Sequence, residues 1–209
     1  MKSIELGVKK ESNYYIYSPS LQGQKTFFYP LVVGNFMYEE NYSIKRQTYN
    51  SFLIMHIKNG SLSVEIDGAA FYANKDEIVL LDCFKPHKYT AIKESEVTWL
   101  HFGSVVAREY FNTITENQKY KFNDTLNIIK TLNKIYRIFS ENLPIKEALI
   151  SKYITDILTD LILNSENTSS INNIEKSIIY INENISKEIT LETLARNVAL
   201  SPFYFTRIF

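Results

Sequence analysis

The hydrophobic and polar positions of this chain change their period midway along its length. Up to Gly103, short runs rich in aromatic and β-branched residues are separated by glycines, which is typical of strands and turns. From about Asn123 onward, apolar residues recur at spacings of three and four, which is typical of helices. All six glycines lie in the first part. The pattern predicts a β domain followed by helices.

Two turn dipeptides, Asn59-Gly60 and Asp67-Gly68, are the strongest hairpin signals in the β part. Residues 61–66 between them alternate apolar and polar side chains, so one face of this strand should meet a core and the other should meet water. We therefore expect consecutive antiparallel strands here. Many short strands at regular spacing predict a barrel or sandwich, which can enclose one small ligand. The other strands are expected at 27–33, 44–48, 52–58, 70–73, 77–81, 88–92 and 97–102.

Two helices with wide apolar faces are predicted after the strands. The first begins near Asn123, and the second has Pro144 in its first turn and ends near Leu163. Residues 164–173 are polar and lack apolar periodicity, so they are expected to form a linker. The predicted domains are therefore 1–163 and 174–209, and the second is an all-helical domain that opens with an amphipathic helix.

The C-terminal segment carries two helix starts in close succession. Thr190 is a suitable N-cap for a helix over Leu191–Asn197, and Ser201 followed by Pro202 suits the start of another. A short helix, a tight turn and a second capped helix form the helix-turn-helix pattern, whose second helix enters the major groove of DNA. In that second helix Phe205 is expected to pack inward with Ile208 and Phe209. The candidate DNA-contacting residues are Ser201, Phe203, Thr206 and Arg207.

Several stretches of the chain resemble AraC-family transcription regulators. The β part is similar to their cupin-type sensor domain, and the C-terminal segment is similar to the first half of their DNA-reading domain. The resemblance implies an α+β fold of two domains: an N-terminal cupin-like antiparallel β-barrel with a helix pair, then a helix-turn-helix domain that is incomplete because the family continues past Phe209. The stretches are 52–60, 79–82, 86–89, 99–103, 189–195 and 200–209.

The same resemblance supplies candidate ligand-binding residues. In family members that sense sugars, an arginine on an early strand, a tyrosine shortly after a histidine and a tryptophan on a late strand line the pocket. Arg46, Tyr89 and Trp99 resemble these residues, and His87 is a hydrogen-bonding candidate beside them. Arginine offers five fixed donors, while tyrosine and tryptophan combine a flat apolar face with a polar tip. The implied effector is a carbohydrate. The alternatives are a core tryptophan that fills the barrel and a structural histidine.

A metal-dependent cupin enzyme is the less favoured alternative. Such enzymes need several imidazole or carboxylate ligands around one ion, commonly with an H-x-H pair. The histidines His56, His87 and His101 are isolated, and no H-x-H occurs. Cys83 lies in an apolar run and is read as a small buried hydrophobe. We therefore expect no catalytic residue, no metal and no cofactor.

Charge and hydropathy narrow the list of partners. The chain has 23 Lys+Arg and 23 Asp+Glu, so its total charge does not indicate a nucleic-acid binder. From Asn164 onward there are four basic and five acidic residues, which predicts weak DNA binding by this chain alone. No apolar run reaches the roughly 18 residues of a membrane span, and no signal peptide is evident. We expect a cytoplasmic homodimer that binds a small effector and promoter DNA, without membrane contact. A dimeric sensor that does not bind DNA is the alternative function.

Overall fold

The computed structural model describes residues 5–116, 118–123, 127–166, 177–178, 180–182, 184–185, 189–198 and 200–208. Two compact units are present, residues 1–164 and 165–209, and each is described by itself. The strands of the first unit are β1 (Asn13–Ile16), β2 (Tyr29–Tyr38), β3 (Ser43–Arg46), β4 (Phe52–Asn59), β5 (Ser61–Ile66), β6 (Ala69–Asn74), β7 (Glu77–Asp82), β8 (His87–Ala91), β9 (Ser95–Gly103) and β10 (Lys121–Asn123). Its helices are α1 (Leu21–Thr26), α2 (Ala107–Ile114), α3 (Ile128–Ser140) and α4 (Glu147–Glu166).

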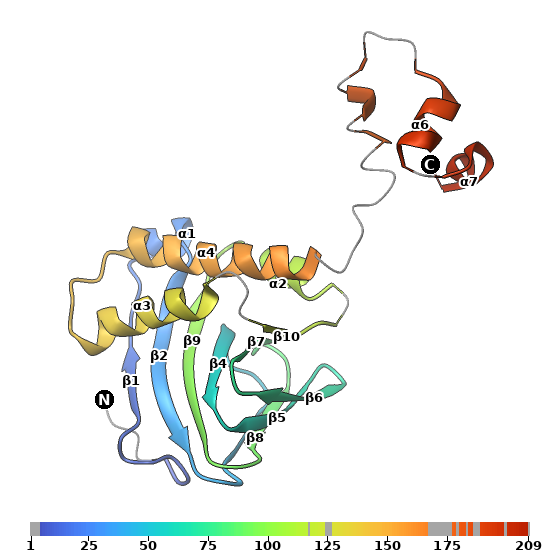
Figure 1. The fold of residues 1–209 in the computed structure, drawn as a ribbon. Helices are drawn as coiled ribbons and strands as arrows, with labels where there is room; N and C mark the ends of the chain where they lie inside the picture. The colour runs from blue at the N-terminus through green and yellow to red at the C-terminus, as the bar shows by residue number, and fades with distance from the viewer. Residues whose placement is uncertain are drawn as a thin grey trace. The chain divides into compact units, whose positions relative to one another are not determined.

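The strands form two antiparallel sheets (Figure 1). Within the described residues, one sheet has the order β1-β2-β9-β4-β7-β10 and the other has the order β3-β8-β5-β6. Their apolar faces contribute to one continuous core, which extends to side chains of α2, α3 and α4. Strands β1 and β3 each lie at an edge of their sheet, beside β2 and β8. This arrangement brings the side chains of β1, β2 and β9 opposite those of β3 and β8.

The two glycine turns have different roles. Asp67-Gly68 forms the predicted two-residue hairpin, since Ile66 pairs with Ala69 and both turn residues have positive φ. The hairpin expected at Asn59-Gly60 is wrong, because β4 pairs with β7 and β9 while β5 pairs with β6 and β8. The chain instead crosses there from one sheet to the other. A Cβ on Gly60 would lie 2.1 Å from the Ser95 Oγ, so the close approach of the two segments requires glycine.

The predicted alternation of β5 is confirmed. Leu62, Val64 and Ile66 are buried, while Ser63 is half-buried and Glu65 is exposed. Strands β4 and β9, by contrast, are buried on both faces for most of their length. One face of β9 meets the space between the sheets and the other meets the helices, with α3 packed against both β2 and β9.

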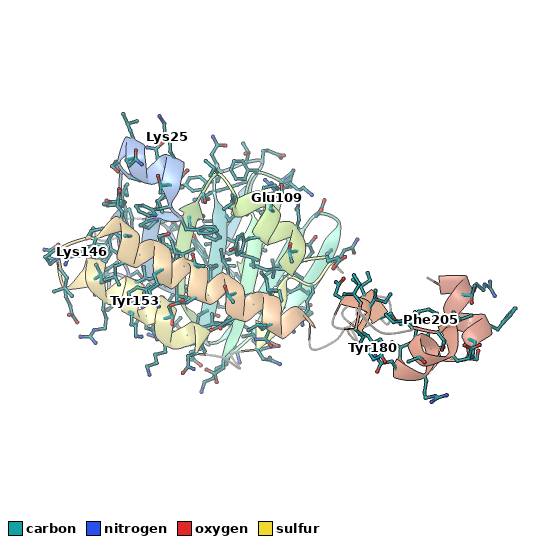
Figure 2. The ribbon with its side chains drawn as sticks, turned by 90° about the horizontal axis from the view of Figure 1, so that it is seen from above. Lys25, Glu109, Lys146, Tyr153, Tyr180 and Phe205 are labelled. Carbon is teal, nitrogen blue, oxygen red and sulfur yellow. The ribbon has the colours of Figure 1, made fainter. Side chains whose placement is uncertain are left out.

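Helices α3 and α4 lie beside each other over the first unit, as the view from above shows (Figure 2). The Lys134 ammonium of α3 sits 5.6 Å from the centre of the Tyr153 ring of α4. Helix α4 buries Ile150, Ile154, Ile157, Leu158 and Leu161 against the core. It begins at Glu147, so the expected position of Pro144 in its first turn is wrong. Helix α4 runs to Glu166, and residues 167–173 of the expected linker lie outside the described residues.

A segment that precedes β2 was not predicted and packs on both the sheet and α4. Strand β1 pairs with β2, and Ser20 caps α1 by accepting a hydrogen bond from the Gly23 N–H at 2.9 Å. The Glu147 carboxylate of α4 accepts hydrogen bonds from the Ser20 N–H at 2.7 Å, the Ser20 hydroxyl at 2.6 Å and the Tyr17 hydroxyl at 3.0 Å. One carboxylate thus holds this segment against α4.

The second unit contains α6 (Leu191–Asn197) and α7 (Pro202–Ile208) at the predicted positions. Thr190 caps α6, with its hydroxyl accepting a hydrogen bond from the Thr193 N–H at 3.2 Å. The helices share a small core of Ala195, Val198 and Phe205, with Leu194 and Leu200 packed against it. Phe205 therefore packs inward as predicted, whereas the Ile208 side chain and Phe209 lie outside what the structure describes. The helix expected at 174–185 falls largely outside it as well.

None of the helices in the described residues is both long enough and apolar enough to cross a membrane.

Candidate ligand-binding site

A cavity of about 310 Å³ lies between the two sheets on the side of β1 and β3. This volume falls within the range of small-molecule sites in proteins. Aromatic rings make up about half of its wall, and the remaining residues include one arginine, one histidine and one glutamate. The lining residues are Glu5, Tyr14, Ile16, Val32, Phe36, Tyr38, Tyr42, Ile44, Arg46, Tyr49, Tyr89, Trp99 and His101.

Arg46 is the last residue of β3 and brings the cavity its positive charge. Its guanidinium carbon lies 5.0 Å from the centre of the Tyr49 ring, in a cation–π contact. Among the described residues, Arg46 makes no ion pair and no hydrogen bond through its side chain. Its five N–H donors are therefore not committed to a protein acceptor.

Three tyrosines form a hydroxyl-bearing cluster in the cavity. The rings of Tyr38 and Tyr42 stack with their centres 4.3 Å apart, and the centres of the Tyr38 and Tyr89 rings are 6.3 Å apart. The Tyr42 hydroxyl donates to the Glu5 carboxylate at 3.0 Å. Burial raises the pKa of all three tyrosines, that of Tyr89 to about 12. At neutral pH the cluster therefore presents uncharged hydroxyls.

Trp99 of β9 presents its indole to the cavity and lies over the backbone of β2. It pairs in register with Gly34, and a Cβ at that position would lie 2.3 Å from the Trp99 Cζ2. The Phe36 ring stands at 90° to the indole with its centre 5.2 Å away. Trp99 is only 8% exposed, and its Nε1–H has no hydrogen-bond partner among the described residues. A buried donor without a partner is rare in proteins, so this N–H is a candidate donor to a ligand.

His101 follows Trp99 on the same face of β9 and is held in a neutral form. Its Nδ1 lies 2.8 Å from the Ser51 Oγ, and its ring meets the edge of Tyr49 with centres 4.7 Å apart. Burial, aided by the charge of Arg46, lowers the pKa of His101 to about 3. His101 is therefore uncharged at neutral pH, and Ser51 already engages one of its two ring nitrogens.

The structure brings three of the four predicted ligand-binding residues together. Arg46, Tyr89 and Trp99 all line the cavity, whereas His87 does not. His87 pairs with Arg46 in register but lines a separate hollow of about 290 Å³ between β3 and the β5–β6 turn. Its Nδ1 lies 2.8 Å from the Lys85 carbonyl oxygen, so this nitrogen carries the proton and donates.

Sequence reasoning missed several cavity residues. Tyr42 lies four residues before Arg46, so alternation along β3 could have placed its side chain on the same face. The same alternation relates His101 to Trp99, but both faces of β9 carry aromatic residues and are buried, so the pattern could not select the inner one. Tyr49 and Glu5 lie outside the strands and carried no periodic signal.

Neither a metal centre nor an activated thiol stands out in the described part of the chain. No three His, Cys, Asp or Glu side chains there lie close enough together to hold a metal ion. Cys83 is buried, and burial raises its thiol pKa to about 12, so it stays protonated at neutral pH.

The family model described as the AraC-like ligand binding domain matches residues 29–158, which include every cavity residue from Val32 to His101. The chain belongs to this family. No curated protein sequence matches it. This AraC-like chain carries the ligand-binding domain of that family, and its predicted α+β fold, with an antiparallel β domain followed by helices, is confirmed.

Solved structures with similar folds include regulators and cupins. The AraC-like transcriptional activator CuxR is 11% identical with a TM-score of 0.51, and the match covers 94% of this chain and 84% of CuxR. ToxT from Vibrio cholerae is 11% identical with a TM-score of 0.45, over 87% of this chain and 74% of ToxT. A cupin superfamily protein from Desulfitobacterium hafniense is 9% identical with a TM-score of 0.33, over 43% of this chain and 75% of that protein.

The second unit presents a separate candidate surface on α7. Ser201 caps this helix, with its hydroxyl accepting a hydrogen bond from the Tyr204 N–H at 3.2 Å. Phe203 is 83% exposed, and Thr206 and Arg207 are exposed as well. All four predicted DNA-contacting residues thus lie on the surface of this unit.

Proposed function

We propose that this chain is a ligand-responsive transcription regulator that binds a carbohydrate in the cavity and couples this binding to promoter DNA in the cytoplasm. The observation that carries the proposal is the combination, around one cavity, of Trp99 on the six-stranded sheet with hydroxyl and guanidinium donors on the four-stranded sheet opposite. Sugars combine apolar ring faces with many hydroxyls, and this cavity offers both a flat indole and polar partners.

Three polar groups of the cavity have a role in this proposal. The Trp99 Nε1–H donates to a sugar oxygen, and Arg46 donates to one or two more. Tyr89 donates or accepts at neutral pH because its hydroxyl stays protonated. Loss of any one of these partners leaves a polar ligand group unpaired in a low-dielectric site, which costs about 1–3 kcal/mol of binding free energy.

A thermal-shift screen tests the carbohydrate assignment. The screen uses free monosaccharides and oligosaccharides on wild-type protein, Arg46→Ala and Lys45→Ala, where Lys45 is an exposed neighbour that does not line the cavity. A sugar at about 100 times its Kd should stabilise the wild type by about 2.7 kcal/mol. For a domain of this size that corresponds to a rise of about 5–10 °C in Tm. We expect the rise to persist in Lys45→Ala and to be lost in Arg46→Ala. If no sugar raises the wild-type Tm, the carbohydrate assignment is wrong.

The DNA-binding part of the proposal rests on α6 and α7 as a helix-turn-helix. Helix α7 would enter the major groove with Phe203, Thr206 and Arg207, while Ser201 would lie near a phosphate. Selection of bound duplexes from a random pool, followed by fluorescence anisotropy at two salt concentrations, tests this role. Arg207→Ala should weaken binding of the selected duplex about tenfold or more, whereas Arg137→Ala on α3 should not. If no duplex is enriched, a dimeric sensor without DNA binding becomes the better assignment.

We also propose that the chain forms a homodimer through α3 and α4. Leu149 and Leu163 of α4, and Leu143 in the connection between α3 and α4, are each more than a third exposed, although most apolar residues of α4 are buried. Ligand binding would then act by favouring one arrangement of the paired units over another. Sedimentation velocity of the wild type and Leu149→Glu checks the interface, and an unchanged dimer in the variant would place the contact elsewhere.

A further inference from the structure

Arg46 differs from the other half-buried arginine of the first unit. Arg108 lies over the Phe52 ring at 4.7 Å and also pairs with the Asp82 carboxylate through both of its terminal nitrogens. Arg46 lies over Tyr49 at a similar distance but has no carboxylate partner among the described residues. A guanidinium beside aromatic rings is partly removed from water, so its charge favours a nearby anion.

We propose that the ligand is a sugar acid, whose single carboxylate binds the Arg46 guanidinium while its hydroxyls meet Tyr89 and Trp99. This inference rests on the carbohydrate role proposed above and specifies the class of sugar. The planar fork of arginine matches a carboxylate with two parallel hydrogen bonds. Neutral hydroxyls match this fork less well, because each accepts a hydrogen bond without charge assistance.

The other titratable side chains of the cavity do not neutralise this charge at the Arg46 end. His101 and the clustered tyrosines Tyr38, Tyr42 and Tyr89 are uncharged at neutral pH. The cavity's own carboxylate, Glu5, accepts a hydrogen bond from the Tyr42 hydroxyl and forms no ion pair with Arg46. Because Glu5 adds a negative charge to the same cavity, a monoanion fits better than a doubly charged phosphate ester. The cavity volume of about 310 Å³ suits a monosaccharide acid.

Matched pairs of ligands test the inference. Isothermal titration calorimetry on the whole chain compares glucuronate with glucose, galacturonate with galactose, and gluconate with sorbitol. Glucose 6-phosphate tests whether a doubly charged phosphate ester binds, and benzoate tests whether a carboxylate without hydroxyls binds. We expect at least one acid to bind about tenfold or more tightly than its neutral partner, since hydrogen bonds to a charged group are worth more than neutral ones. Raising the salt concentration should weaken binding of the acid and leave binding of the neutral sugar unchanged.

Variants at two neighbouring positions of β3 distinguish the effect on binding of a charge in the cavity from that of a charge on the surface. In Arg46→Gln, the affinity for the acid should fall to that for its neutral partner. Arg46→Lys should restore part of this difference in affinity. Lys45→Gln removes an equal charge from outside the cavity and should behave as the wild type. The unfolding midpoint of each unliganded variant confirms that it folds.

The outcomes distinguish this inference from the proposed function. Equal binding of a neutral sugar and its acid, or an unchanged preference in Arg46→Gln, overturns the sugar-acid inference and leaves the carbohydrate site standing. Tighter binding of glucose 6-phosphate than of every acid also overturns it. Binding of benzoate without any sugar or sugar acid overturns the carbohydrate role itself, as does binding of none of the compounds.

Discussion

Replacement of Gly34 by alanine should displace Trp99 from its position on the cavity wall. A Cβ at residue 34 would lie 2.3 Å from the Trp99 Cζ2 and 2.6 Å from its Cε2, whereas ordinary contacts begin near 3.4 Å. The indole must therefore move by about 1 Å or more. Its neighbours Phe36 and His101 limit that movement. Overpacking of this kind costs about 1–3 kcal/mol, so the free energy of unfolding should fall by that amount.

Trp99 is the sole tryptophan of the chain, so its fluorescence reports on this site directly. Gly34→Ala should shift the emission spectrum of the folded protein and lower the urea midpoint. Gly68→Ala is the matched control, because a Cβ there meets nothing within 4 Å while its φ of +77° strains any other residue. It should cost about 1 kcal/mol without a change in emission.

A double variant tests whether the cost arises from this contact. Phenylalanine lacks the outer ring of the indole, so Trp99→Phe should tolerate alanine at residue 34 and the two effects on stability should not add. Their coupling is measured from urea denaturation followed by circular dichroism, since the tryptophan signal is lost. Unchanged stability and emission in Gly34→Ala would refute the close packing of Trp99 on β2.

Three further predictions concern stability. Asp82 is buried and pairs with Arg108, so Asp82→Asn should lower the free energy of unfolding by about 1–3 kcal/mol in urea denaturation, and Asp82→Glu should lower it less. Burial lowers the pKa of His101 to about 3, so the unfolded chain takes up its proton first as the pH falls. The free energy of unfolding should therefore fall by at most about 1.4 kcal/mol per pH unit as the pH is lowered from 6.5 to 3. In His101→Gln, urea midpoints measured over that pH range should vary less with pH. Glu147→Gln weakens the hydrogen bonds to Ser20, so hydrogen exchange should accelerate in residues 17–26 and stay unchanged in β4.

Local conformation could be predicted from the sequence where interactions between neighbouring residues determine it. The Asp67-Gly68 turn, the alternation of β5 and the caps at Thr190 and Ser201 were each predicted and are present. The turn at Asn59-Gly60 shows the limit of this reasoning. Its residues do form a bend, but which strands pair across it depends on segments far away in the sequence.

Part of the candidate site could be predicted from the sequence. Arg46, Tyr89 and Trp99 were chosen by motif and do share one cavity, while His87 was chosen in the same way and lies outside it. Strand β1 and helix α1 were not predicted, because their short sequences carry little periodic signal and they are held by contacts with β2 and Glu147. Their packing supplies Tyr14 and Ile16 to the cavity wall.

The sequence by itself determined that most of the strands precede the helix pair, the family, and three of the residues that line the cavity. Periodicity and turn chemistry act over a few residues, so they are visible in any linear stretch of chain. Only the tertiary structure decided which face of β9 points inward, since helices cover its other face and both faces are apolar. It also decided that Arg46 lies over the Tyr49 ring and, among the residues that the structure describes, forms no ion pair with a carboxylate. Such facts depend on the approach of segments from separate strands and loops, which no local pattern records.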